Sequence, residues 1–483
     1  MKRYLAIIVL LTAAIAGKAE PLSLDMSKAS IISTTQSSVF DITIFKFLYP
    51  SIDGDGKEII LSGLSVFPYK TSSTTGRQIL PQNMIIGCHV TITDDSERPS
   101  NFGALLYPLN EVYALNYFAE GNDDMTNVLQ NNLLVMPDYM GYGETKDSIH
   151  PYLIEELTAR NVVDGARYGK ALMETLTYVE DGNTKNYQMD GDGWKTVICG
   201  YSQGAAAALA TDRFIEENGY SEDMHLLGCV CGDGPYSEQI TMNSYAEDGR
   251  LNMPAVAPLV LNGLINYDSL MRKHSVDEYL SPRFLQTGIM RWIQSKTMSL
   301  TDISDSLRKK GFVDHTIQAI FRSDIVDCMK GGSANEAYSD LQKAMAHNDL
   351  TTGWTPRHRI CLFHSSVDDV VSVNNCTAFM NNNYTGRDGL VKSVIDSIGT
   401  HSATGVKFFT DNVLQMIGWL YADAQTWYAA GDDYTPTSIQ TIDGGNATYR
   451  QNHKIYDLYG RCVDASNLTK GIYIRDGRKF VVR

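Results

Sequence analysis

The stretch Val197-Ile-Cys-Gly-Tyr-Ser-Gln-Gly-Ala-Ala-Ala-Ala-Leu-Ala210 decides the fold. Its first half predicts a buried β-strand, its second half predicts an alanine-rich helix, and Ser202 falls in the turn between them. Gly200 and Gly204 stand two residues before and two after this serine, where they let the backbones pack closely. Such a turn lifts the hydroxyl out of the sheet edge at the positive end of the helix. Ser202 is therefore the candidate nucleophile, and Gly200 and Gly204 form the elbow that holds it.

Apolar runs elsewhere predict the strands that flank this turn. Four runs separated by helical stretches are 83–90, 132–137, 195–200 and 225–231. Their apolarity is continuous rather than alternating, which indicates parallel strands covered by helices on both faces. An antiparallel start is expected at 39–48 and 58–67, a helix within 151–179, later strands at 359–363 and 392–398, and a final helix at 407–423. The pattern predicts an α/β fold with a mostly parallel sheet that is interrupted once.

A serine nucleophile needs a base, and the base needs a carboxylate to orient it. With a nucleophile elbow of this kind the chain order is serine, acid, histidine. Asp368 follows the predicted strand 359–363 by a few residues, and Asp369 is the near alternative. Only His401 and His453 come after these acids, and His453 lies in the tail. We therefore expect Asp368 to orient His401, and His401 to act as the base.

The negative oxygen of a tetrahedral intermediate needs backbone N–H donors. The N–H of Gln203, directly after the nucleophile, is expected to be one donor. The second is expected from the loop after the strand at 83–90, at Val90 or Thr91, with His89 as a candidate brace for that loop. These amides would form the oxyanion hole.

No metal or other cofactor is expected. The sequence holds no C-x-x-C and no Cys/His cluster with metal-ligand spacing. The two Asp-Gly-Asp-Gly stretches at 53–56 and 190–193 lack the distal Glu of a calcium loop and are expected to be turns. Five of the eight cysteines fall in predicted buried strands, where a thiol behaves as a small hydrophobe; these are Cys88, Cys199, Cys229, Cys231 and Cys361.

With these residues in place, the chain resembles secreted α/β-hydrolases of the secretory lipase and carboxylesterase kind. The segments that carry the resemblance are Met136-Pro-Asp-Tyr-Met-Gly-Tyr-Gly143, His150-Pro-Tyr, Gly200-Tyr-Ser-Gln-Gly204, Asp349-Leu, Trp354-Thr-Pro356 and the Asp368 loop. The resemblance implies an α/β-hydrolase fold and hydrolysis of a small-molecule or lipid-like carboxylic ester through an acyl-enzyme. A serine exopeptidase of the prolyl-oligopeptidase type is the alternative, although no propeller-length repeat precedes the hydrolase region. A non-catalytic binding protein on the same fold is a third reading, and the order of the three candidate residues argues against it.

A long helix-rich tract, residues 237–355, separates the first part of the core at 20–236 from the second part at 356–430. Insertion between the serine strand and the acid loop is where such folds carry a cap over the active site. The tract holds seven of the 18 methionines. Flexible thioethers suit an adaptable apolar pocket for acyl chains, although for any single methionine a place in the core of the cap is the more frequent role.

The net charge and the first 19 residues indicate possible partners and the cellular location of the protein. The formal net charge of -15 argues against nucleic acid as a partner, because phosphate binding needs a basic face. Residues 1–19 combine Lys2 and Arg3, an apolar run and small residues, which predicts a cleavable export signal. No later apolar run has the length that a membrane-spanning helix requires. We expect an exported protein that is secreted, periplasmic or held at the cell surface.

Residues 431–483 are expected to form a linker and a small β appendage that contains a hairpin. Alternating apolar residues flank Asp476-Gly477, a strong hairpin signal. The tail resembles the C-terminal sorting domains of the type IX secretion system. This resemblance rests on Tyr456-Asp457-Leu458, Gly460-Arg461, Gly471-Ile472-Tyr473 and Lys479. It implies the secretion machinery as a partner.

Overall fold

The computed structural model describes residues 23–101, 111–383, 390–397 and 399–429, and the tail strands at 455–457, 462–463, 471–475 and 478–482. The predicted export signal at 1–19 lies outside the described residues, as do Leu458, Gly460, Arg461 and the predicted turn Asp476-Gly477.

A nine-stranded sheet forms the centre of the described chain, in the order β1-β2-β3-β5-β4-β8-β9-β10-β11. The strands are β1 (Ser30–Ser37), β2 (Ile42–Ile52), β3 (Glu58–Pro68), β4 (Met84–Cys88), β5 (Leu133–Pro137), β8 (Thr196–Tyr201), β9 (Leu226–Gly232), β10 (Arg359–Ser365) and β11 (Val391–Asp396). From β5 to β11 every neighbouring pair is parallel. The pairs β1–β2, β2–β3 and β3–β5 are antiparallel. The predicted mostly parallel sheet with an antiparallel start is therefore confirmed.

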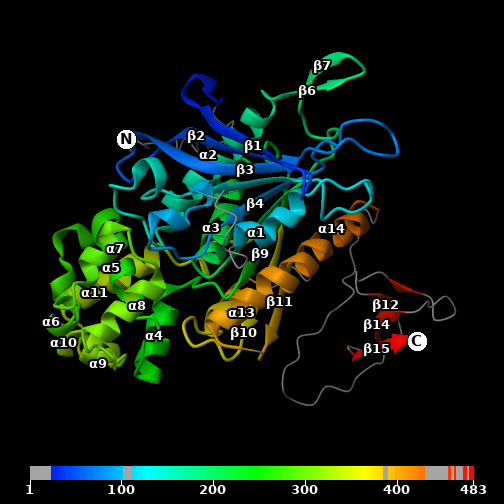
Figure 1. The fold of residues 1–483 in the computed structure, drawn as a ribbon. Helices are drawn as coiled ribbons and strands as arrows, with labels where there is room; N and C mark the ends of the chain where they lie inside the picture. Colours follow the sequence, from blue (N-terminus) through cyan, green and yellow to red (C-terminus); the bar gives the residue numbers. More distant parts are fainter. Residues whose placement is uncertain are drawn as a thin grey trace, which may run out of the picture.

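The parallel strands are apolar throughout because both faces of the sheet are buried. Successive side chains of a strand point to opposite faces. In β4, Ile86 joins the core under α2 (Glu155–Met173) and α3 (Gln203–Glu217), whereas Ile85 joins the core under α1 (Glu111–Leu115) and α14 (Val413–Ala429). Figure 1 shows this sheet between its two layers of helices.

Eight α-helices occupy the chain between β9 and β10, which are neighbours in the sheet. They are α4 (Glu238–Asp248), α5 (Val256–Tyr267), α6 (Pro282–Leu285), α7 (Ile289–Ser295), α8 (Leu300–Lys309), α9 (Ile317–Ile320), α10 (Ser323–Met329) and α11 (Glu336–His347). In Figure 1 they gather, in green, into one group beside the sheet. We call this group the inserted helices.

Several elements differ from the sequence prediction. The expected final helix at 407–423 is three segments: α13 (His401–Lys407), a π-helical turn at Phe408–Asn412, and α14. The edge strand β1 and the small hairpin of β6 (Thr177–Glu180) and β7 (Asn183–Asn186) were not expected. In the tail, β12 (Ile455–Asp457), β13 (Cys462–Val463), β14 (Gly471–Arg475) and β15 (Arg478–Val482) form an antiparallel sheet, and β14 pairs with β15 as the predicted hairpin requires.

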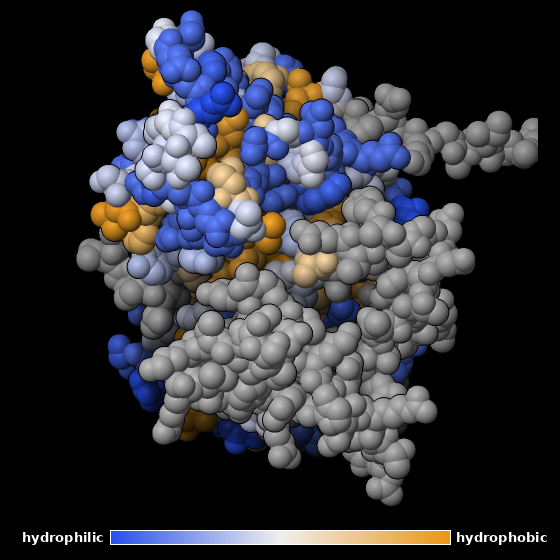
Figure 2. Space-filling model, turned by 90° about the vertical axis from the view of Figure 1, so that its right-hand side faces the viewer, coloured by the Kyte–Doolittle hydropathy of each residue, from blue (hydrophilic) through white to orange (hydrophobic). Residues whose placement is uncertain are grey.

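The remaining helix of the core, α12 (Asn374–Asn383), follows the loop after β10. All five cysteines expected on buried strands are buried and unpaired. On the face shown in Figure 2 the described surface is mainly hydrophilic, with smaller apolar patches between the polar residues. Within the described chain, no helix has the length and apolarity needed to cross a bilayer.

Candidate active site

Ser202 lies in a strained turn that two glycines make possible. It joins β8 to α3 with φ +55° and ψ −123°, in the region that non-glycine residues rarely adopt. A Cβ on Gly200 would lie 2.1 Å from the carbonyl oxygen of Gly204, and one on Gly204 would lie 2.2 Å from that of Cys88. Only hydrogen fits at either position, so strand, turn and helix can pack closely beneath the serine.

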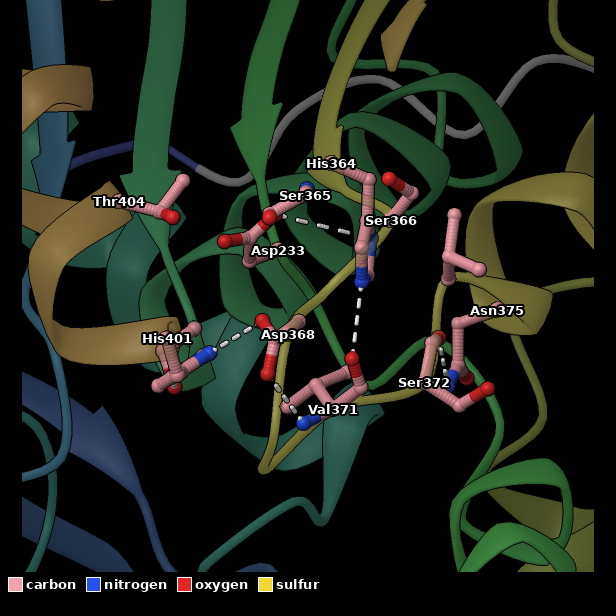
Figure 3. Close-up of polar contacts among 12 residues, drawn as sticks. Asp233, His364, Ser365, Ser366, Asp368, Val371, Ser372, Asn375, His401 and Thr404 are labelled. Atoms are coloured by element: carbon pink, nitrogen blue, oxygen red, sulfur yellow. Dashed lines mark hydrogen bonds and ion pairs between the residues drawn. The ribbon is translucent and has the colours of Figure 1, made fainter. Parts of the chain in front are cut away.

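The structure brings the three predicted residues Ser202, His401 and Asp368 into one hydrogen-bonded chain. His401 Nε2 lies 2.8 Å from Ser202 Oγ, and His401 Nδ1 lies 2.6 Å from Asp368 Oδ2. Asp368 stands in the loop after β10 and His401 is the first residue of α13, so both reach the serine from the same edge of the sheet. Figure 3 shows the imidazole directed at the Asp368 carboxylate.

The neighbouring acids Asp368 and Asp369 make different contacts with His401. The second oxygen of Asp368, Oδ1, accepts the backbone N–H groups of Val370 and Val371, each at 2.8 Å. Asp369 Oδ1 accepts the backbone N–H of His401 at 3.1 Å, whereas the ring Nδ1 bonds Asp368. Asp369 therefore holds the start of α13, whereas Asp368 holds the imidazole.

The pKa shifts of this pair follow from their contact. Burial raises the pKa of Asp368, but the hydrogen bond and charge of His401 and the two loop amides outweigh it, so the pKa lies below its usual value. Burial lowers the pKa of His401, but the hydrogen bond and charge of Asp368 outweigh it, so the pKa lies above its usual value. The site therefore favours an ionised Asp368 next to an imidazole that gains a proton readily.

A third acid, Asp233, stands behind this pair and was missed by sequence reasoning. It follows the carboxyl end of β9, and its ligand atom lies within 4.8 Å of those of Asp368 and His401. Asp233 Oδ1 accepts the N–H of Ser365 at 2.8 Å, and its other oxygen bonds the hydroxyl of Tyr201 (Figure 3 shows Asp233 and Ser365). Burial, with the charge of Asp368, raises its pKa to about 7. An acid just past a buried strand was the available signal.

Gln203 presents its backbone N–H at the first position of α3, where no residue of the helix can accept it. Its side chain is fixed elsewhere, because Gln203 Nε2 lies 2.7 Å from Nε2 of His150. The other ring nitrogen of His150 lies 2.8 Å from the carbonyl oxygen of Met140. His150 therefore donates to Met140 and accepts from Gln203 as a neutral ring, and burial lowers its pKa to about 3. The backbone N–H of Gln203, beside Ser202, has no acceptor among the described residues.

The two candidates for the second oxyanion donor, Val90 and Thr91, differ in their hydrogen bonds. The N–H of Val90 lies 3.2 and 3.1 Å from the two carboxylate oxygens of Glu111, so it is already engaged and its expected role as an oxyanion donor is not supported. The N–H of Thr91 has no acceptor among the described residues, and Thr91 and Ser202 line the same cavity. His89 lies with Nδ1 2.7 Å from the Val90 carbonyl and stacks on Tyr139, as expected of a brace.

A mainly apolar cavity lies in front of Ser202, and the empty space in it, including the part that is open to solvent, is about 740 Å³. Its described walls come from the loops beside the serine and from the inserted helices α4, α5 and α11. Three of the seven methionines of the insertion line it, namely Met242, Met253 and Met345. The arrangement can hold an apolar chain next to the serine hydroxyl.

One further group of potential metal ligands lies away from Ser202. It consists of Asp212 and Glu216 on α3 with His358 before β10. Glu216 already accepts hydrogen bonds from the N–H of Arg357, from the N–H and Nδ1 of His358, and from Trp354 Nε1, at 2.6 to 3.0 Å. These donors occupy its carboxylate, so the group acts as a clamp between α3 and the segment that enters β10.

Comparisons with known proteins agree with this geometry. The model of the Secretory lipase family matches residues 128–412, a stretch that contains Ser202, Asp368 and His401. Fold and match together define a lipase-like α/β-hydrolase, which is a carboxylic ester hydrolase. Because the match covers more than half of the residues, the chain belongs to the secretory lipase family. No curated protein sequence matches it.

Solved structures with the same fold include two esterases or lipases. The rice cell wall degrading esterase LipA from Xanthomonas oryzae is 19% identical with a TM-score of 0.59, over 79% of this chain and 95% of that chain. Candida antarctica lipase A is 13% identical with a TM-score of 0.51, over 77% of this chain and 76% of that chain. At these identities the likeness establishes the fold.

Proposed function

We propose that this enzyme cleaves carboxylic esters through an acyl-enzyme formed on Ser202. His401 Nε2 takes the hydroxyl proton while Ser202 Oγ attacks the acyl carbon, and Asp368 stabilises the imidazolium that results. When the carbon–oxygen bond to the alcohol breaks, His401 returns the proton to the departing alkoxide. The alcohol leaves, and the acyl group remains bonded to Ser202.

The second half of the reaction repeats these steps with water. His401 takes a proton from water as its oxygen attacks the acyl carbon, and then returns the proton to Ser202 Oγ as the carboxylic acid leaves. The N–H groups of Gln203 and Thr91 stabilise the negative oxygen of both tetrahedral intermediates. Removal of one such donor typically costs ~3 kcal/mol of transition-state stabilisation.

The observation that carries the proposal is the unbroken chain from Ser202 Oγ through both ring nitrogens of His401 to Asp368, at 2.8 and 2.6 Å. The raised pKa of His401 supports it, since a base must hold the proton it removes. The apolar walls of the cavity favour an ester with an apolar chain over a charged peptide.

Hydrolysis of p-nitrophenyl acetate, butyrate and palmitate, compared with Gly-Pro-p-nitroanilide, tests the bond that is cleaved. We expect turnover of the esters and none of the anilide, with Ser202→Ala as the inactive control. Cleavage of the anilide alone would contradict the proposal and favour an exopeptidase.

We also propose that the enzyme is exported, with residues 1–19 removed and the tail acting as an address for the secretion machinery. The family to which the chain belongs is described as secretory, which supports export. Mass spectrometry of the enzyme from the medium of its native host should find a new N-terminus near residue 20. Deletion of 455–483 should leave the enzyme inside the cell envelope, and unchanged export of that variant would refute the role of the tail.

A further inference from the structure

The described walls of the cavity in front of Ser202 contain one carboxyl group, that of Glu238. Around it the cavity is lined mainly by aliphatic and thioether side chains of the inserted helices, including Met242, Val256, Leu261 and Met345. Glu238 is the first residue of α4, directly after the N-cap residue Ser237. A carboxyl group in such a wall requires a physical explanation.

No hydrogen bond to a described residue accounts for the position of the Glu238 carboxyl. Glu238 is 6% exposed, and neither of its carboxyl oxygens has a hydrogen-bond partner among the described residues. The capping of α4 is already served by Ser237, whose side chain accepts the N–H of Ile240. A first-turn acid interacts with the helix dipole equally well on a solvated face, so capping does not explain burial in the cavity. An unpaired buried carboxyl is costly unless a ligand or water completes it.

The surroundings of Glu238 determine which form it takes. Burial raises its pKa well above the usual value, and the charges that act on it, those of Glu155, Asp268 and Asp349, raise it further. All three are acids, and the cavity wall contributes no cation. These surroundings favour the protonated form of Glu238, a carboxylic acid with one O–H donor and a carbonyl acceptor.

We propose that Glu238 is a specificity-determining residue that hydrogen-bonds a hydroxyl group on the substrate chain lying in this cavity. The preferred substrates are then esters whose otherwise apolar chain bears a hydroxyl. This inference rests on the ester hydrolysis proposed above and adds the substrate class.

The energetic reason lies in what each chain does to the Glu238 carboxyl. A plain alkyl chain that fills the cavity displaces water from the carboxyl and leaves its donor and acceptor unpaired. A chain with a hydroxyl at the right depth restores both interactions. In general, an enzyme discriminates against a substrate that leaves a buried polar group of the site unpaired.

The experiment compares p-nitrophenyl octanoate with its 3-, 6- and 8-hydroxy derivatives. The wild-type enzyme should prefer one hydroxy ester by about tenfold in kcat/KM. Glu238→Leu should abolish this preference by accelerating the octanoate and slowing the hydroxy ester. Glu238→Gln, which keeps a donor and an acceptor, should retain most of it.

The matched control is Asp212→Leu, since Asp212 is also buried, has no hydrogen-bond partner for either carboxyl oxygen among the described residues, and is absent from the described cavity wall. The control variant should prefer the same hydroxy ester over the octanoate by the same factor as the wild-type enzyme. No preference in the wild type, or an unchanged preference in Glu238→Leu, would overturn the inference. If Glu238→Gln loses the preference for the hydroxy ester as completely as Glu238→Leu does, the inference is also overturned. That result would indicate that Glu238 pairs with a charged amine rather than with a hydroxyl. An enzyme that hydrolyses none of the four esters would instead refute the proposed function.

Discussion

Replacement of Asp368 by Asn tests how the imidazole is oriented. Asp368 Oδ1 is held by the N–H groups of Val370 and Val371, and an Asn side chain satisfies these only with its carbonyl oxygen. The amide NH₂ of Asn then occupies the place of Oδ2, 2.6 Å from His401 Nδ1. Because NH₂ donates, Nδ1 must accept, and the ring proton moves to Nε2.

The Asp368→Asn replacement therefore leaves the His401 ring in place but removes its ability to act as a base. An imidazole that carries its proton on Nε2 cannot take the proton of Ser202, so kcat should fall about 10⁴-fold, equivalent to ~5 kcal/mol of transition-state stabilisation. Asp369→Asn still accepts the N–H of His401 through its amide oxygen, so we expect a loss of about threefold or less, the size expected of a weakened exposed charge.

The assay is the initial rate of p-nitrophenyl butyrate hydrolysis at saturating substrate. Thermal unfolding checks that both variants fold, and we expect their melting temperatures to lie close to that of the wild type. Equal losses in Asp368→Asn and Asp369→Asn would refute the assignment of the two acids. A larger loss in Asp369→Asn would reverse it.

Two further predictions concern the protonation and the packing of the site. The pKa of His401 lies above the usual 6.5, so kcat/KM should fall as pH drops through a midpoint above that value. Asp233 contributes to that rise, so Asp233→Asn should move the midpoint to lower pH in a pH–rate profile, and an unmoved midpoint would refute its contribution. Gly204→Ala places a Cβ 2.2 Å from the Cys88 carbonyl and should lower stability by about 3 kcal/mol or more in urea unfolding. The control is Gly418→Ala in α14, where the added Cβ meets no described atom within 4 Å beyond the neighbouring backbone of its own helix, and it should leave stability unchanged or raise it by ~0.5–1 kcal/mol.

The sequence predicted the parallel strands well because both faces of each are buried. Continuous apolar runs such as 132–137 have few alternatives, and the structure places β5 there. The edge strand β1 escaped prediction because its residues are mostly exposed and polar, so burial imposes no pattern on them. The π-helical turn before α14 also escaped prediction. The spacing of apolar residues through this turn is close to that of an unbroken α-helix, so the sequence pattern does not reveal it.

Within the site, residue type and chain order were sufficient to select Ser202, Asp368 and His401. The distinction between Val90 and Thr91 was beyond reach, because it depends on which backbone N–H the carboxylate of Glu111, 21 positions after Val90, accepts. The direction of a single N–H is set by such tertiary contacts and leaves no trace in local sequence.

The central claim, an acyl-enzyme on Ser202, is tested most directly by intact-protein mass spectrometry after treatment with a fluorophosphonate. Ser202 Oγ should displace fluoride and add one phosphonyl group, which peptide mapping should locate on Ser202. The Ser202→Ala variant should remain unmodified under the same conditions. Absence of labelling in a folded wild-type enzyme that hydrolyses p-nitrophenyl butyrate, or equal labelling of both proteins, would contradict the claim.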